Sequence, residues 1–124
     1  MPLVIQSMIL RRDLRANPDI LYIFGDNEAR VGLGGQAGEM RGEPNAIGVA
    51  TLAAPGRYWR QDDTARQCSV IDKDLRSARA AIVAGRIVVF PADGIGTGIA
   101  DLRNRAPDTF AHLERRIAAL RQAG

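Results

Sequence analysis

After a turn at Pro18, the chain runs through Ile20-Leu21-Tyr22-Ile23-Phe24, five apolar residues without a polar interruption, and then reaches Gly25. A short apolar run of this kind is typical of a central strand that is buried on both faces. Similar runs occupy residues 3–10, 45–51 and 86–91, so we expect further strands there. The strand signal therefore recurs along most of the chain.

Helical periodicity separates these runs. Residues 72–84 are expected to form a helix with Asp72 as its N-cap and Gly85 directly after its last turn. A final helix should begin near Pro107, because proline is favoured at the first helical position. The apolar faces of the two helices would consist of Leu75, Ala78, Ile82, Phe110, Leu113, Ile117 and Leu120. Alternating strands and helices predict one α/β domain over residues 1–124, with a mixed, mainly parallel sheet covered by helices.

The composition of the chain excludes several classes of protein and of site. The chain has 124 residues, 46% hydrophobic and 25% charged, which is the composition of a folded globular domain. No apolar run approaches the roughly 20 residues that span a bilayer, and no secretory signal is visible, so we expect a cytoplasmic protein without a membrane partner. The single cysteine, Cys68, excludes an internal disulfide and a multi-cysteine metal site, and nothing indicates a cofactor. Lys73 is the only lysine among 17 basic residues, and the charges are interspersed rather than clustered.

Two of the expected strands end in loops that are unusually rich in glycine, at residues 25–36 and 91–102. Ligands of parallel sheets sit beyond the carboxyl ends of the strands, so both loops should reach one site. Alternate glycines allow backbone N–H groups to approach an anion, and a helix beginning after Gly35 would add its dipole. Neither loop is a Walker A motif or a good dinucleotide fingerprint. The candidate ligand contacts are Asp26, Asn27, Gly34, Gly35, Gln36, Asn45, Gly94, Ile95, Gly96, Thr97 and Gly98.

These candidates differ in what they offer. Thr97 adds a hydroxyl donor to the second loop, and the oxygen-rich pair Asp26 and Asn27 could serve a nucleoside or a sugar. Asn45 lies between the first loop and the next strand, where it either contacts a ligand or secures the turn. Two such loops at one edge of the sheet could hold a diphosphate between them.

The two loops resemble the signatures of macrodomains. The first is a strand followed by asparagine and a glycine-rich loop, here residues 24–27 and 32–36, and the second is a strand followed by alternating glycines, here residues 88–91 and 94–98. The resemblance covers about residues 20–120 and is greatest to the compact branch that contains the terminal ADP-ribose protein glycohydrolases. It implies a three-layer α/β/α sandwich that binds ADP-ribose or a related NAD-derived nucleotide. Residues 35–48 are also similar to uncharacterised phage and bacterial proteins.

Catalysis does not follow directly from this resemblance, because that branch uses a lysine nucleophile. The lysine position falls near Thr51 and Leu52, neither of which can form a Schiff base. Asp101 approximately matches the aspartate that follows the second loop in that branch. Hydrolysis by an ordered water, with Asp93 or Asp101 as the base, and binding without chemistry both remain open, as does a nucleotide or nucleoside hydrolase.

The alternative to a nucleotide site is a non-enzymatic interaction module. Residues 57–60, Arg-Tyr-Trp-Arg, interleave aromatic and basic side chains, as in surfaces that stack on bases and contact phosphates. This alternative would use residues 57–66 to contact a protein or a nucleic acid. His112 and Cys68 are interpreted as incidental rather than catalytic, because neither has a catalytic partner nearby in the sequence.

Overall fold

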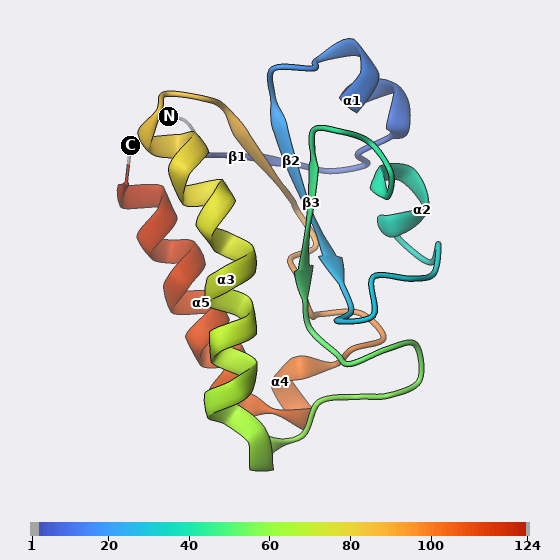
Figure 1. Cartoon of the computed structure of the whole chain (residues 1–124), viewed down its shortest axis with the longest axis vertical. Helices are drawn as coiled ribbons and strands as arrows, with labels where there is room; N and C mark the ends of the chain where they lie inside the picture. Colours follow the sequence, from blue (N-terminus) through green and yellow to red (C-terminus); the bar gives the residue numbers. More distant parts are fainter. Residues whose placement is uncertain (1–2, 124) are drawn as a thin grey trace.

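The computed structural model describes residues 3–123 and shows an α/β domain built on a four-stranded sheet (Figure 1). All four strands are parallel, in the order β1-β4-β2-β3, so the expectation of a mixed sheet is wrong for the part of the chain described. The elements in chain order are β1 (Leu3–Gln6), α1 (Arg11–Ala16), β2 (Leu21–Asp26), α2 (Ala37–Met40), β3 (Ala46–Ala50), a 3₁₀ turn (Gln61–Asp63), α3 (Thr64–Val83), β4 (Val88–Pro91), α4 (Leu102–Arg105) and α5 (Pro107–Gln122).

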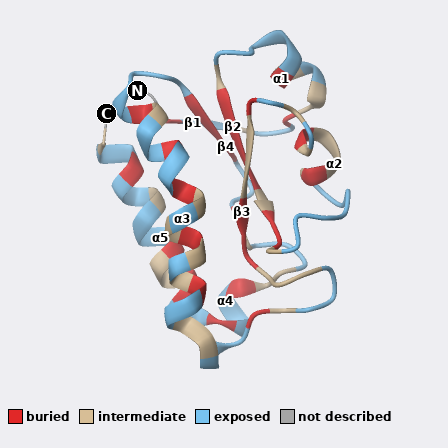
Figure 2. Cartoon of the chain, in the orientation of Figure 1, coloured by how far each residue is buried: buried red, intermediate tan, exposed pale blue. Residues whose placement is uncertain are grey.

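The central strands β2 and β4 are buried on both faces, as the unbroken apolar runs predict. On one face Leu21, Ile23 and Phe90 pack in the larger core cluster with residues of α3 and α5. On the other face Tyr22 and Phe24 pack against the shorter helices α1 and α2. Figure 2 shows the buried residues concentrated in the strands and on the sides of the helices that face them.

Helix α3 is longer than its sequence pattern indicates. It begins at Thr64, with Asp63 at the N-cap, so the prediction that Asp72 caps this helix is wrong. The apolar periodicity in the sequence begins at Leu75, whereas the helix also buries Ile71 one turn earlier and Gln67 two turns earlier. Its end is as expected, because Gly85 takes a left-handed φ of 83° just past the last turn.

Helix α5 begins at Pro107 as predicted. Its expected stripe packs inward, with Phe110, Leu113 and Leu120 buried and Ile117 partly buried against the core. None of the helices in residues 3–123 has the length and apolar character needed to cross a membrane. The strands meanwhile all point their carboxyl ends toward the same edge of the sheet, where the two glycine loops emerge (Figure 1).

Candidate functional site

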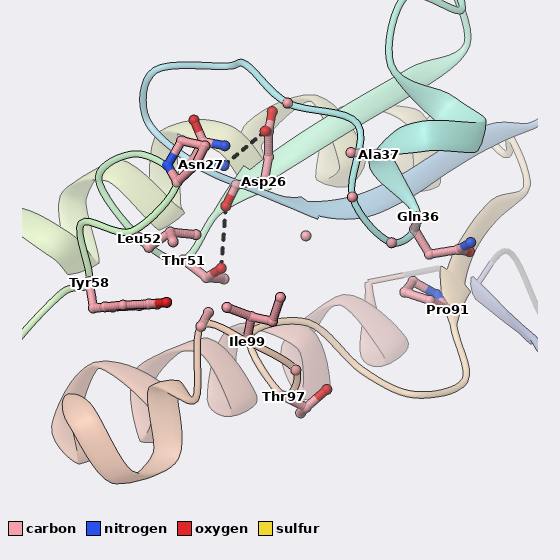
Figure 3. Close-up of a pocket in the computed structure, with 18 of the residues that line it drawn as sticks. Asp26, Asn27, Gln36, Ala37, Thr51, Leu52, Tyr58, Pro91, Thr97 and Ile99 are labelled. Carbon is pink, nitrogen blue, oxygen red and sulfur yellow. Dashed lines mark hydrogen bonds between the residues drawn. The ribbon is translucent and has the colours of Figure 1, made fainter.

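A cavity of about 700 Å³ lies beyond the carboxyl ends of β2, β3 and β4 (Figure 3). It is lined by parts of three segments: the end of β2 with the loop after it (25–37), the loop after β3 (51–58), and the end of β4 with the loop after it (91–100). Its volume falls within the range of small-molecule sites. Both glycine loops thus border the same space, as their positions in the sequence predict.

The second loop turns its carbonyl groups toward the protein. The carbonyl oxygen of Gly96 accepts a hydrogen bond from Leu102 N at 2.9 Å, and that of Gly98 accepts one from Asp101 N at 3.0 Å. Within residues 3–123, the N–H groups of residues 95–99 donate no hydrogen bond. Gly96 has a φ of 76°, a left-handed conformation that strains any residue with a Cβ. The loop therefore presents several unpaired donors at the border of the cavity.

Thr97 differs from its expected role. Its hydroxyl donates to the carbonyl oxygen of Asp93 at 2.6 Å, so the proton predicted for a ligand is used within the loop. Thr97 can still offer its backbone N–H. Asp93 itself lines the cavity and is exposed.

The first loop reaches the cavity through Gly34, Gly35 and Gln36. Gly35 has a φ of 57°, which glycine adopts without strain. The helix that follows, α2, has only four residues, so the expected contribution of a helix dipole is small. What this loop offers a ligand is its backbone, since none of the N–H groups of residues 34–36 makes a hydrogen bond among the described residues.

Asp26 lines the same cavity, but its carboxylate is fully engaged by the protein. Oδ1 accepts from Asn27 N at 2.8 Å and from Arg41 Nη2 at 2.5 Å. Oδ2 accepts from Arg41 Nη1 at 3.2 Å and from Arg30 Nη1 at 3.5 Å. A carboxylate has about four acceptor positions, and all four are used. Asp26 is therefore a residue that positions other groups rather than an open ligand contact.

Arg41 fastens the first loop to Asp26. Besides its paired bonds to that carboxylate, it donates from Nε to the carbonyl oxygen of Gly32 at 2.8 Å and from Nη2 to that of Val31 at 3.2 Å. Asn27 Nδ2 also donates to Val31 O, at 2.8 Å. The sequence alone does not indicate this role, because a lone arginine after a glycine loop carries no signature of its partner.

Gly48 on β3 makes room for this arrangement. A Cβ at Gly48 would lie 2.8 Å from the Cβ and 2.9 Å from the Cγ of Asp26, closer than real contacts allow. Arg30, the second partner of Asp26, donates to Asp74 on α3 at 2.6 Å, and Asp74 accepts from Ala50 N at 2.8 Å. The charged network thus connects the loop after β2 to β3 and α3.

Three candidates from the sequence do not line the cavity. Asn45 Nδ2 donates to three carbonyl oxygens, those of Leu14, Asn17 and Ile20, each at 3.0 Å, so it secures the turn before β2. Ile95 is buried in the core beneath the loop. Asp101 is the N-cap residue of α4, with a φ of 43°, and accepts a hydrogen bond from Asn104 at 2.8 Å. Of the two aspartates considered as a base, only Asp93 borders the cavity.

Sequence reasoning missed the apolar end of the cavity, which is formed by Leu52, Tyr58 and Ile99. Figure 3 shows the Tyr58 side chain extending into the cavity with its hydroxyl toward Ile99. The ring is held by Arg105, whose guanidinium carbon lies 3.8 Å from the ring centroid. The Tyr58 hydroxyl has no hydrogen-bond partner among residues 3–123, and Ile99 is 81% exposed. This end can therefore accept a ring or a sugar together with one polar group.

Residues 57–66 do not form a free stacking surface. Trp59 is buried and donates from Nε1 to Glu28 at 2.6 Å. Arg66 pairs with Glu28 at 2.8 Å and with Asp63 at 2.5 Å. The hydrogen bond from Arg66 is the main cause that holds the pKa of Glu28 below its usual value.

The two residues interpreted as incidental lie at the seam between α3 and α5. His112 contacts Asp72 at 2.7 Å across this seam. Burial raises the pKa of the Cys68 thiol, so the reactive thiolate is disfavoured. Neither residue lines the large cavity.

Comparison with known proteins assigns the chain to a family. A model of a family of unknown function, DUF7831, matches residues 4–116. No protein with a curated description and no solved structure matches the chain. The match spans both glycine loops, β2, β3, β4 and all of β1 except Leu3. The chain is therefore a member of the DUF7831 family.

Proposed function

We propose that the chain binds ADP-ribose or a closely related NAD-derived nucleotide, with the diphosphate held between the two glycine loops. The observation that carries this proposal is the set of N–H groups at residues 96–99 that are unpaired among residues 3–123, on the border of a cavity that the first loop also lines. Successive backbone N–H groups in a glycine-rich turn form an anion site. Of the two carboxylates on the lining, that of Asp26 is neutralised by Arg41 and Arg30 and does not repel a diphosphate, whereas that of Asp93 is exposed to solvent.

The rest of the cavity fits the remaining parts of such a ligand. Leu52, Tyr58 and Ile99 offer apolar surface beside a free hydroxyl, which suits a ribose or a planar ring. On this proposal the domain is a macrodomain-like α/β/α sandwich, with α3 and α5 on one side of the sheet and α1 and α2 on the other (Figure 1). The resemblance of the two loops to macrodomain signatures supports the same ligand.

Hydrolysis of an ADP-ribosyl linkage is a second step that the same cavity could support. Asp93 is an exposed carboxylate on the lining and could orient and deprotonate a water. Lys73 lies on α3 and does not line the cavity, so a lysine nucleophile is not available there. Binding is therefore the core of the proposal, and hydrolysis is an addition that requires Asp93.

Calorimetric titration of the full chain with ADP-ribose, with AMP and ATP as comparisons, tests the proposal. We expect saturable heat with ADP-ribose and weaker binding of AMP, which lacks the diphosphate. Absence of heat at millimolar ADP-ribose would reject the proposal.

Gly98→Glu is the variant that best probes the cradle. No atom lies within 4 Å of a Cβ placed there and its φ is not left-handed, so the fold should tolerate the change. Gly96→Glu would not be informative, because Gly96 has a left-handed φ and a Cβ there would meet Leu102 and Thr51 at 3.2 Å. We expect Gly98→Glu to abolish binding by placing a carboxylate beside the diphosphate. Ser77→Glu, an exposed site on α3 with the same change of charge, should bind like the unmodified protein.

A further inference from the structure

A second hollow, of about 240 Å³, lies between α3 and α5 and shares no lining residue with the large cavity. Its floor includes the buried side chains of Leu75 and Leu120. Its rim carries three arginines, Arg76 and Arg79 from α3 and Arg116 from α5. We refer to it as the arginine groove.

The charges in the arginine groove do not cancel. The one acidic residue on its lining, Asp72, pairs with Arg116 at 3.0 Å and also contacts His112 at 2.7 Å. Arg76 and Arg79 are exposed and have no carboxylate partner among residues 3–123. Two guanidinium groups therefore face the same hollow without a counter-charge from the described part of the chain.

The excess of positive charge continues along both helices. Residues 75–83 of α3 and 115–122 of α5 contain arginines and no acidic residue. The two helices run side by side in the same direction, so these basic segments lie next to each other (Figure 1). Arg115 and Arg121 are exposed like the arginines of the groove. The result is a basic strip with an apolar floor.

We propose that the arginine groove binds single-stranded nucleic acid through its phosphate backbone. A strand carries one charge per nucleotide, at an axial spacing of about 3.4 Å in a duplex, so several guanidinium groups can be neutralised by neighbouring phosphates of one ligand. The apolar floor formed by Leu75 and Leu120 suits the sugar or base of an unpaired nucleotide, which a duplex would keep stacked inside. Arginine at all three rim positions favours phosphate, because its planar fork forms paired hydrogen bonds to it.

This surface differs from residues 57–66, the segment that the sequence pattern favours for nucleic acid. In that segment Trp59 is buried and Arg66 is paired twice, whereas Arg76 and Arg79 remain unpaired among the described residues. The lining of the arginine groove also comes from α3 and α5 alone and contains no residue of the loops at the carboxyl edge of the sheet. The inference therefore stands independently of ADP-ribose binding.

Fluorescence anisotropy with a labelled single-stranded oligonucleotide of about ten nucleotides tests the proposal on the full chain. We expect binding that weakens with salt, with a log–log slope that corresponds to about −0.7 per phosphate contact. The double variant Arg76→Glu/Arg79→Glu should lower the affinity at least about tenfold, since each arginine makes a charge-assisted contact. The salt slope should become shallower by about 1.4, the share of two contacts.

The matched control is Arg57→Glu/Arg60→Glu, which changes the net charge by the same amount on exposed residues of the other segment. It should leave the affinity within about twofold if the groove is the site. Equal weakening by both double variants, loss only in the control, or no binding at low salt would each overturn the proposal. So would a duplex or a poly-glutamate peptide that competes as well as the unlabelled strand. Thermal melting of both variants confirms that they fold, and saturating ADP-ribose should not displace the strand.

Discussion

Replacing Gly48 by alanine should destabilise the protein because it removes the space that the Asp26 carboxylate occupies. The new Cβ would lie 2.8 Å from the Asp26 Cβ and 2.9 Å from its Cγ, about 1 Å inside a normal carbon–carbon contact. Asp26 is 5% exposed and must shift, which lengthens its bonds to Arg41 and Arg30. Loss of one or two charge-assisted hydrogen bonds at a buried carboxylate costs about 2–4 kcal/mol. For a chain of this size that corresponds to a fall in melting temperature of about 8–16 °C.

Calorimetric melting and urea unfolding of Gly48→Ala measure this loss. Gly34→Ala is the matched control, because no atom lies within 4 Å of a Cβ there and its φ is not left-handed, so its melting temperature should stay within about 3 °C. Hydrogen exchange adds a local readout: the amides of Arg30 and Val31, which donate to Asn27, should exchange faster in Gly48→Ala, since Arg41 would no longer hold the loop at Gly32 and Val31. If Gly48→Ala melts within about 2 °C of the unmodified protein, Asp26 is not confined as described.

Three further changes test other parts of the molecule. Tyr58→Phe should weaken ADP-ribose about three- to tenfold in calorimetry and leave the melting temperature unchanged, because the lost hydroxyl has no partner among residues 3–123. Asp93→Asn should slow release of ADP-ribose from an ADP-ribosylated peptide at least about 100-fold while ADP-ribose affinity stays within about twofold; equal turnover would exclude Asp93 as the base. The lowered pKa of Glu28 should make the free energy of unfolding fall as the pH drops below about 4.5, since the unfolded carboxyl takes up its proton first. Urea titrations should show a flatter pH dependence for Glu28→Gln, and Arg66→Gln should move in the same direction.

Local signals in the sequence are sufficient to predict much of the fold. The apolar run at residues 20–24 predicts a doubly buried strand, and Gly85 and Pro107 predict a helix end and a helix start, because each depends on nearby backbone geometry. The start of α3 could not be predicted in this way. Its first turns bury Gln67, whose amide donates to the carbonyl oxygen of Arg60 at 2.8 Å and whose oxygen accepts from Thr109 at 2.5 Å. A polar residue that is buried through partners distant in the sequence does not contribute to an apolar pattern.

The same distinction applies to the site. The two glycine loops were predicted to meet because parallel strands share a carboxyl edge, and they do border one cavity. Side-chain roles were less predictable, since they depend on partners far along the chain. The sequence predicts Asp26 as a ligand contact, but Arg41, fifteen positions later, engages its carboxylate. Asn45 is likewise committed to carbonyl groups up to 31 positions earlier.

The glycines around the cavity fall into two groups, those that the backbone conformation requires and those that it does not. Gly35 and Gly96 have left-handed φ values of 57° and 76°, so the backbone alone accounts for glycine there. Gly34 and Gly98 have neither a left-handed φ nor any atom within 4 Å of a Cβ, and a larger residue would fit. Glycine at such a position lowers the stability by about 0.4–1 kcal/mol relative to alanine, because glycine gives the unfolded chain more conformational freedom. No contact within the folded protein requires glycine at these two positions. We therefore infer that the open space beside their backbones serves a ligand that approaches them closely.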